Sequence, residues 1–153
     1  MTMKLKDTIQ KALTTAMKEK NEDAKRTLRL AMSSIKIAEV EERGELDESR
    51  ILGILQKEVK TREDSLQEAQ AAGRQDLVDQ AQREIEILNQ FLPKQMETDE
   101  LKQLAKEVIE ETGASGMRDI GTVMKNLMPK LQGRASGQDA SKIVKELLQK
   151  NQS

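Results

Sequence analysis

Apolar residues recur at helical spacing along almost the whole chain. In the third such stretch, for example, Ile51, Leu55 and Val59 follow one another at intervals of four. Residues spaced by three or four lie on one face of an α-helix, whereas strands would show alternation. Four of these stripes occupy residues 1–93, where short polar or glycine-containing connections separate them and Pro93 ends the last. They predict four amphipathic helices, packed as an antiparallel bundle or a long helical hairpin.

Shorter stripes follow a polar linker after Pro93. They begin near Leu101, Met117 and Ile143. Residues 94–153 are therefore predicted to form a smaller three-helix C-terminal domain, separate from an N-terminal helical domain over residues 1–93. The predicted fold class is all-α.

Polar residues with capping chemistry precede several of the predicted helices. A side-chain oxygen at this position accepts a hydrogen bond from a free amide of the first helical turn. The predicted N-cap residues are Asn21, Asp47, Thr98 and Ser136.

The residue types that are missing restrict the chemistry of the chain. It has no His, Cys, Trp or Tyr, and Phe91 is its single aromatic residue. Histidine is the usual acid–base group at neutral pH and the commonest metal ligand, and cysteine is the usual thiol nucleophile. We therefore predict no catalytic residues, no metal and no cofactor.

Charge is balanced over the chain but not along it. The 26 basic and 27 acidic residues give a net charge of −1, so no global attraction to polyanions is expected. Between Met117 and Lys150, however, seven basic residues stand against three acidic ones. No segment approaches the roughly 18 apolar residues of a membrane-spanning helix. We expect a soluble, cytoplasmic protein with no membrane partner and with local anion affinity near its C-terminal end.

A glycine-framed turn, Gly133-Arg134-Ala-Ser-Gly137, separates the last two predicted helices. A guanidinium can bind phosphate through two hydrogen bonds, and the amides of a helix start favour anions. Turn chemistry alone also explains the motif, if Gly133 ends one helix in a left-handed conformation and Ser136 caps the next. Both interpretations stay open, although no cap requires Arg134. The candidate phosphate-binding residues are Lys125, Lys130, Gly133, Arg134, Gly137 and Lys142.

Arg62 falls within the apolar stripe of the third predicted helix. A buried guanidinium needs a carboxylate partner. Glu58, four residues earlier, and Glu84, on the next predicted helix, are the candidates. We interpret the three as a structural ion pair that sets the register of two helices.

Several short motifs, taken in order, resemble the YqeY-like family over nearly the whole chain. They are Lys57–Ser65, Ala72–Leu77, Phe91–Pro93, Gly121–Lys125 and Gly133–Gly137. Gly121–Ala135 is also similar to the tail domain of the GatB subunit of aspartyl/glutamyl-tRNA amidotransferase. The sequence departs from the family pattern at Ala81, Phe91 and Ser136, where Glu, Tyr and Asp are frequent among relatives.

The resemblance implies a helical N-terminal part followed by a three-helix tail. In the amidotransferase the tail contacts tRNA. The family is associated with carbon–nitrogen ligase activity that uses glutamine as amide donor, but the catalytic parts of GatB have no counterpart in this chain.

We therefore expect a non-catalytic accessory module that binds RNA, with tRNA as the leading ligand. Basic side chains would hold phosphates, because no aromatic platform is present on which bases could stack. The alternative is a protein–protein adapter whose N-terminal helices dock on a tRNA-modifying or metabolic enzyme. A third hypothesis is a catalytic fragment of an amidotransferase.

Overall fold

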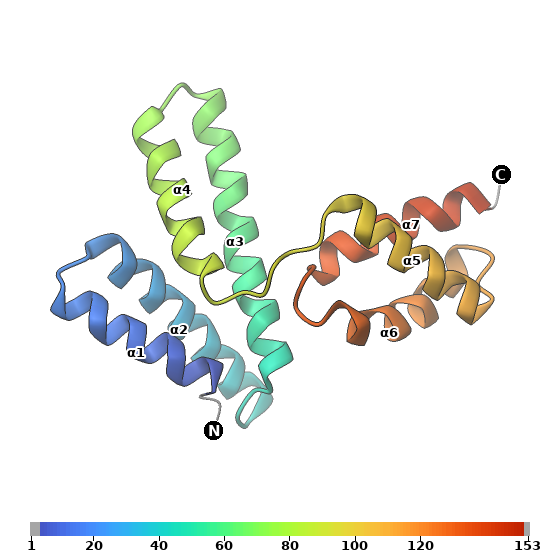
Figure 1. Cartoon of the computed structure of the whole chain (residues 1–153), viewed down its shortest axis with the longest axis horizontal. Coiled ribbons are helices and arrows are strands. Elements are labelled where there is room, and N and C mark those ends of the chain that lie inside the picture. Colours follow the sequence, from blue (N-terminus) through green and yellow to red (C-terminus); the bar gives the residue numbers. More distant parts are fainter. Residues whose placement is uncertain (1–3, 152–153) are drawn as a thin grey trace. The chain divides into compact units, whose positions relative to one another are not determined.

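The computed structural model describes residues 4–151, which form seven α-helices, one short 3₁₀-helix and no strand (Figure 1). The all-α prediction is confirmed. The first four helices are α1 Leu5–Lys18, α2 Glu22–Glu42, α3 Glu48–Ala71 and α4 Gln75–Asn89. The remaining elements are α5 Thr98–Thr112, η1 Met117–Asp119, α6 Ile120–Leu131 and α7 Gly137–Asn151. The chain divides into two compact units, Met1–Pro93 (unit 1) and Lys94–Ser153 (unit 2).

Unit 1 consists of two antiparallel helical hairpins, α1 with α2 and α3 with α4 (Figure 1). Helix α2 contacts both α3 and α4 and thereby joins the hairpins. Ile9, Ile35, Leu55 and Leu88, one from each helix, are fully buried in a shared core. Removing these side chains from water is the main source of stability for such a unit.

The starts of α2 and α3 are capped as the sequence predicts. Asn21 Oδ1 accepts a hydrogen bond from the Ala24 amide at 3.2 Å, and Asp47 Oδ1 accepts one from the Arg50 amide at 2.8 Å. Each bond satisfies an amide that a helix start would otherwise leave without a partner. Both predicted N-caps are confirmed.

The inward face of α4 differs from the predicted stripe. The spacing of Leu77, Ala81, Ile85 and Leu88 predicts that these residues face the core. In the structure, however, Val78 is 5% exposed and Leu77 is 43% exposed. Glu84 is buried and Ile85 is only partly buried. Because Glu84 faces Arg62 of α3, an ion pair as well as apolar packing sets the rotation of this helix.

Unit 2 is a three-helix arrangement in which α5, α6 and α7 each contact the other two. Val108, Leu127 and Leu148, one from each helix, are fully buried. The predicted sixth helix begins with η1, a tighter turn that leads directly into α6.

Of the two N-caps predicted in unit 2, the structure confirms Ser136 but not Thr98. Ser136 Oγ accepts a hydrogen bond from the Asp139 amide at 3.0 Å, which confirms Ser136 as the N-cap of α7. The prediction for Thr98 is wrong. The carbonyl of Glu97 already accepts from the Leu101 amide at 3.0 Å, so Glu97 is the N-cap and Thr98 is the first helical residue.

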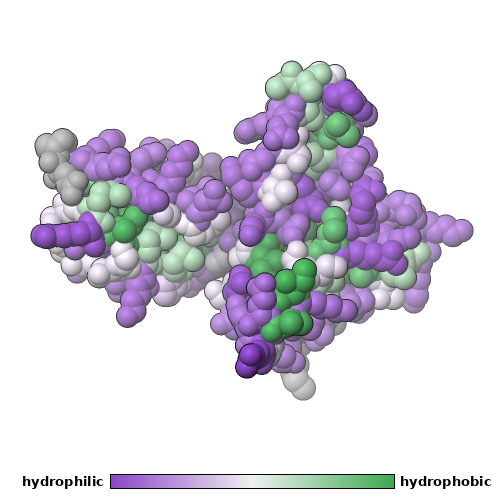
Figure 2. Space-filling view, turned by 180° about the vertical axis from the view of Figure 1, so that it is seen from behind, coloured by the Kyte–Doolittle hydropathy of each residue, from purple (hydrophilic) through white to green (hydrophobic). Residues whose placement is uncertain are grey.

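The surface is largely hydrophilic, and hydrophobic side chains gather in only a few places on the face that Figure 2 shows. The large apolar residues that are exposed in the described part of the chain are Met17, Leu30, Ile37, Val40, Leu77 and Met128. Half of these belong to α2. Between residues 4 and 151, no helix combines the length and apolar character that crossing a membrane requires.

Candidate functional site

The connection between α6 and α7 is a left-handed turn. Gln132, the C-cap of α6, has φ 50°, and Gly133 follows with φ 75°. This conformation is accessible to glycine without strain and costs energy for residues with a side chain. The predicted left-handed residue was Gly133 alone, whereas the structure places two successive residues in this region. Gly133 therefore has a conformational role that is independent of any ligand.

Arg134 fastens this turn to the beginning of unit 2. Its Nε donates to the Lys94 carbonyl at 2.9 Å. Its Nη1 and Nη2 lie 2.9 and 3.0 Å from the two carboxylate oxygens of Glu100, a bidentate pair. The Arg134 carbonyl accepts from the Met96 amide at 2.7 Å. Arg134 therefore has a structural role that the sequence did not indicate, because its side chain closes the turn against the linker and α5.

Lys130 also faces an acid. Its Nζ lies 2.8 Å from Glu111 Oε2, and both side chains are exposed. Glu111 and Glu100 stand at opposite ends of α5, about 16 Å apart along the axis at 1.5 Å per residue. Lys130 and Arg134 are thus directed to opposite ends of α5. They do not converge on one anion as the sequence led us to expect.

The other predicted residues are two lysines and Gly137. Lys125 on α6 and Lys142 on α7 are exposed and make no ion pair within residues 4–151. At Gly137, a Cβ atom would lie 3.2 Å from Met128 Cε. That methyl group ends a flexible side chain that is 45% exposed, so a small shift of Met128 would accommodate the Cβ atom. Among the predicted phosphate-binding cations, only Lys125 and Lys142 therefore have charges that no acid in the described chain neutralises.

A cationic groove that the sequence did not indicate lies between α5 and α7. It has a volume of about 310 Å³ and is lined by Lys102, Lys106, Ile143, Glu146, Leu147 and Lys150. Lys102 and Lys106 are exposed, one helical turn apart, and make no ion pair within the described residues. Lys150 approaches from α7, and Glu146 contributes the acid among the lining residues.

The sequence did not indicate this groove because α5 is rich in acidic residues. Glu97–Glu111 holds six acids and only two lysines, so its composition indicates an acidic segment. The available signal was the spacing of Lys102 and Lys106, because residues four apart share one face of a helix. Which face of α7 they would meet depends on tertiary packing, which no spacing in the sequence gives.

Arg62 is buried in unit 1 and is held by carboxylates from two helices. Its Nη1 lies 2.8 Å from Glu58 Oε2 and also donates to the Glu58 carbonyl at 3.0 Å. Its Nε lies 3.6 Å from Glu84 Oε2 and has no hydrogen-bond partner. Ser34 Oγ donates to the second oxygen of Glu58 at 2.7 Å. The structure thus brings Arg62, Glu58 and Glu84 together between α3 and α4, with α2 alongside.

The same network continues to the surface of α2 and α4. Arg26 Nη2 lies 3.4 Å from Glu84 Oε1 and 2.8 Å from Asp23 Oδ1, and Arg83 Nε lies 2.9 Å from Asp23 Oδ2. The hydrogen bond from Arg26, with further help from Arg83, holds the pKa of Asp23 below its ordinary value. The bond to Asp23 in turn raises the pKa of Arg26. These charged groups are paired with one another within unit 1.

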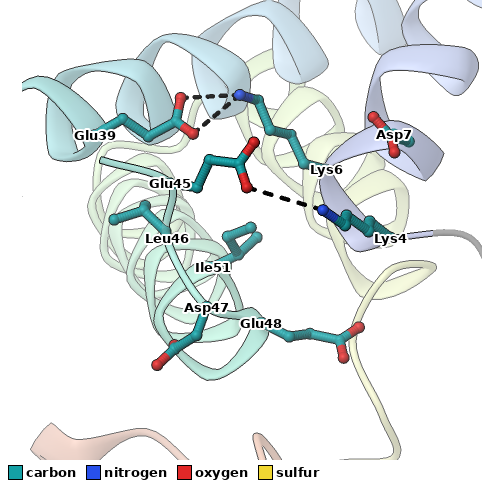
Figure 3. A pocket seen from close by; sticks show the side chains of 9 residues that line it. All are labelled: Lys4, Lys6, Asp7, Glu39, Glu45, Leu46, Asp47, Glu48 and Ile51. Carbon is teal, nitrogen blue, oxygen red and sulfur yellow. Dashed lines mark hydrogen bonds and ion pairs between the residues drawn. The ribbon is translucent and has the colours of Figure 1, made fainter. Parts of the chain in front are cut away.

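A cavity of about 410 Å³ lies where the start of α1 meets the end of α2 and the start of α3 (Figure 3). It is lined by Lys4, Lys6, Asp7, Glu39, Glu45, Leu46, Asp47, Glu48 and Ile51. Lys6 Nζ lies 2.9 Å from Glu39, Lys4 Nζ lies 3.8 Å from Glu45, and Asp47 caps α3. In the described part of the chain, no group of acids is arranged to hold a metal ion. Most charges around this cavity therefore serve the local structure.

The sequence matches the family model described as Yqey-like protein over residues 6–148. The chain belongs to the YqeY-like family. It is 31% identical over 146 residues to Altered inheritance of mitochondria protein 41, mitochondrial, of Pyrenophora tritici-repentis, covering 92% of this chain and 78% of that relative. It is 30% identical over 89 residues to an uncharacterized protein of Schizosaccharomyces pombe, covering 58% of this chain and 72% of the relative.

The family match confirms the resemblance that the ordered motifs indicated, and it spans both units of this YqeY-like chain. The name of the Pyrenophora relative assigns that protein to mitochondria. A cytoplasmic location for the present chain stays a prediction.

Proposed function

We propose that this YqeY-like protein is an accessory RNA-binding module, with tRNA as the leading ligand, and that the α5–α7 groove holds RNA phosphates. The observation that carries the proposal is the pair Lys102 and Lys106, which line an open groove and have no ion-pair partner in the described part of the chain. Lysine is an effective phosphate ligand as a compact point charge. Lys150 on the facing helix also lines the groove.

Lys142 is a natural extension of this surface. It lies one turn before Glu146 on α7, and residues four apart on a helix are neighbours. Lys125, on α6, would add a more distant phosphate contact. Lys130 and Arg134 are no longer the first choices, because Glu111 and Glu100 hold them.

Recognition of this kind reads shape and charge more than sequence. The chain has a single aromatic residue, Phe91, so stacking of bases on aromatic rings is not a major contribution. The module would present RNA to a catalytic partner, in keeping with the amidotransferase association that the family resemblance implies. The proposal assigns no catalytic step to this chain itself.

The test measures fluorescence anisotropy of labelled tRNA with the full chain between roughly 50 and 200 mM salt. Lys102→Gln with Lys106→Gln removes two proposed phosphate contacts. This double variant should bind tRNA more weakly and reduce the slope of log affinity against log salt by about 2. Lys11→Gln with Lys18→Gln is the matched control, because it removes the same charge from exposed, unpaired positions on α1.

Two outcomes would count against the proposal, and they differ. No salt-dependent binding of tRNA by the unaltered protein rejects the RNA-binding function. Binding that the groove variant retains, with an unchanged salt slope, rejects the groove as the site and directs attention to Lys125 and Lys142. Charge reversal at Arg134 is unsuitable as a test, because a carboxylate there would face Glu100 and disturb the fold.

A further inference from the structure

The outer face of α2 carries apolar residues that the fold of unit 1 does not use. Leu30 is 49% exposed, Ile37 is 59% exposed and Val40 is 77% exposed. The core side of the same helix is complete without them, since Leu28 and Ile35 are buried. Large apolar side chains grouped on one exposed face are a feature of interaction surfaces.

The spacing of these residues follows a heptad repeat. Leu30 and Ile37 are seven positions apart and correspond to the a positions of the repeat. Ser33 and Val40, each three positions further along, correspond to the d positions. These are the a and d positions of a helix that packs against another helix over about two heptads. A globular helix that faced only its own core would not need a second apolar line on the opposite side.

A basic edge borders this seam on one side. Arg29 and Lys36 precede Leu30 and Ile37 directly, so they occupy the flanking g positions of the repeat. Both are exposed and make no ion pair with any other residue in positions 4–151. The opposite edge holds Glu41, so the positive charge is one-sided.

A shallow depression lies at the C-terminal end of the seam. It has a volume of about 360 Å³ and is lined by Lys36, Glu39, Val40, Gly44 and Glu45. The two acids are paired with Lys6 and Lys4. An apolar side chain from a partner can enter here beside Val40, with Lys36 next to it.

We propose that this face of α2 docks an amphipathic helix of another protein, one with apolar residues in a heptad pattern and acidic residues along its flank. The apolar seam supplies the contact area, and Arg29 and Lys36 select for acids opposite them. The inference goes beyond RNA binding and gives the adapter hypothesis a defined surface. It does not depend on the groove in unit 2.

Charge argues for a different protein as partner and against a second copy of this chain. Two copies packed antiparallel through this seam bring their g edges together, so Arg29 and Lys36 would meet the same residues of the other copy. A parallel pair would gain attraction chiefly between Lys36 and Glu41. Acids along a partner helix satisfy both basic residues in one arrangement.

The one-sided basic edge also disfavours a membrane surface. Helices that lie in the lipid interface carry basic residues on both borders of the apolar face and often aromatic residues within it. Here Glu41 lies on the second border, and α2 has no aromatic residue.

The experiment uses the full chain and fluorescein-labelled synthetic helical peptides of about three heptads. One peptide carries leucine at a and d with glutamate at e and g, and a second carries lysine at e and g. The glutamate peptide should bind in an anisotropy titration, and the lysine peptide should bind at least about tenfold more weakly.

Two double variants test the surface itself. Ile37→Gln with Val40→Gln should weaken binding of the glutamate peptide by about tenfold or more. Arg29→Glu with Lys36→Glu should exchange the preference between the two peptides. Leu77→Gln is the control, because it alters an exposed apolar residue on α4 and should leave binding unchanged.

Several results would overturn the proposal. They are absence of glutamate-peptide binding up to about 100 μM, equal binding of both peptides, and binding that survives Ile37→Gln with Val40→Gln. Self-association that this variant abolishes would assign the face to a second copy. Binding to phosphatidylserine vesicles in place of the glutamate peptide would assign it to a membrane.

Discussion

Arg62 in unit 1 and Arg134 in unit 2 are each paired with carboxylates, but they sit in opposite environments. The Arg62 side chain is 9% exposed and its partners Glu58 and Glu84 are 22% and 12% exposed. The Arg134 side chain is 32% exposed, and its partner Glu100 is 47% exposed. A buried charge must keep its partners or destabilise the fold, whereas an exposed pair competes with water and contributes little. The same chemical pair therefore supports a core in one unit and positions a turn in the other.

Removal of a buried partner should have the largest effect. Glu84→Ala leaves Arg62 with Glu58 alone and takes from Arg26 one of its two carboxylate contacts. We expect the free energy of unfolding to fall by about 3–5 kcal/mol. Chemical denaturation followed by far-UV circular dichroism measures it, because the chain has no Trp or Tyr for fluorescence.

Glu86→Ala is the matched control for this change. Glu86 lies two residues further along α4, is exposed and makes no ion pair within residues 4–151. Its removal should alter stability by less than about 0.5 kcal/mol. If Glu84→Ala and Glu86→Ala lower the free energy of unfolding equally, the buried network does not stabilise unit 1. The contrast between buried Arg62 and exposed Arg134 would then disappear.

Substitutions at the exposed pair Arg134–Glu100 should change the free energy of unfolding less, and the size of the change should depend on which partner is removed. Glu100→Ala should cost less than about 1 kcal/mol, since it breaks only an exposed ion pair. Arg134→Ala should cost about 1–2 kcal/mol, because it also removes the hydrogen bond to the Lys94 carbonyl. Far-UV circular dichroism gives the magnitude, and hydrogen–deuterium exchange should locate the loosening in residues 94–97 and 132–136.

Lys130→Ala serves as the reference for a purely exposed pair. The Lys130–Glu111 contact involves no backbone group, so its loss should be within about 0.5 kcal/mol. If Arg134→Ala lowers the free energy of unfolding by no more than Lys130→Ala does, the hydrogen bond from Arg134 to the Lys94 carbonyl does not stabilise the turn.

Local patterns in the sequence predicted much of the fold. Helical periodicity located the helices, and Asn21, Asp47 and Ser136 marked three helix starts, because capping depends on residues only a few positions apart. Burial of Arg62 was also predictable, since it interrupts an apolar stripe. Each of these inferences uses information within one helix or its immediate flank.

Features that depend on packing between helices could not be predicted in the same way. The contact between Arg134 and Glu100 joins residues 34 positions apart, which no local pattern in the sequence predicts. The rotation of α4, which buries Val78 and exposes Leu77, depends on the ion pair across to α3 and on apolar packing. The groove formed by Lys102 and Lys106 requires α7 beside α5. These contacts decide which charges are available for a ligand.

The smallest expected effect concerns the outer end of the buried network, where Asp23 links α2 to α4 through Arg83. The guanidiniums of Arg26 and Arg83 hold the pKa of Asp23 below its ordinary value of 3.8. A carboxyl whose pKa is lower in the folded state stabilises the fold above its unfolded pKa, and that stabilisation is lost as pH falls through the folded value. Because the Asp23 side chain is 32% exposed, screening should limit the contribution to less than about 1 kcal/mol.

Asp23→Asn should therefore be slightly less stable than the unaltered protein at neutral pH, and the difference should vanish as pH falls below the ordinary value of 3.8. Denaturation curves at a series of pH values measure this difference. Glu63→Gln is the control, since Glu63 is exposed on α3 and has no ion pair within the described residues. A deficit in Asp23→Asn that persists unchanged at low pH would show that its carboxylate charge is not what joins α2 to α4. The network of ion pairs that stabilises unit 1 would then end at Glu84 and would not include Asp23.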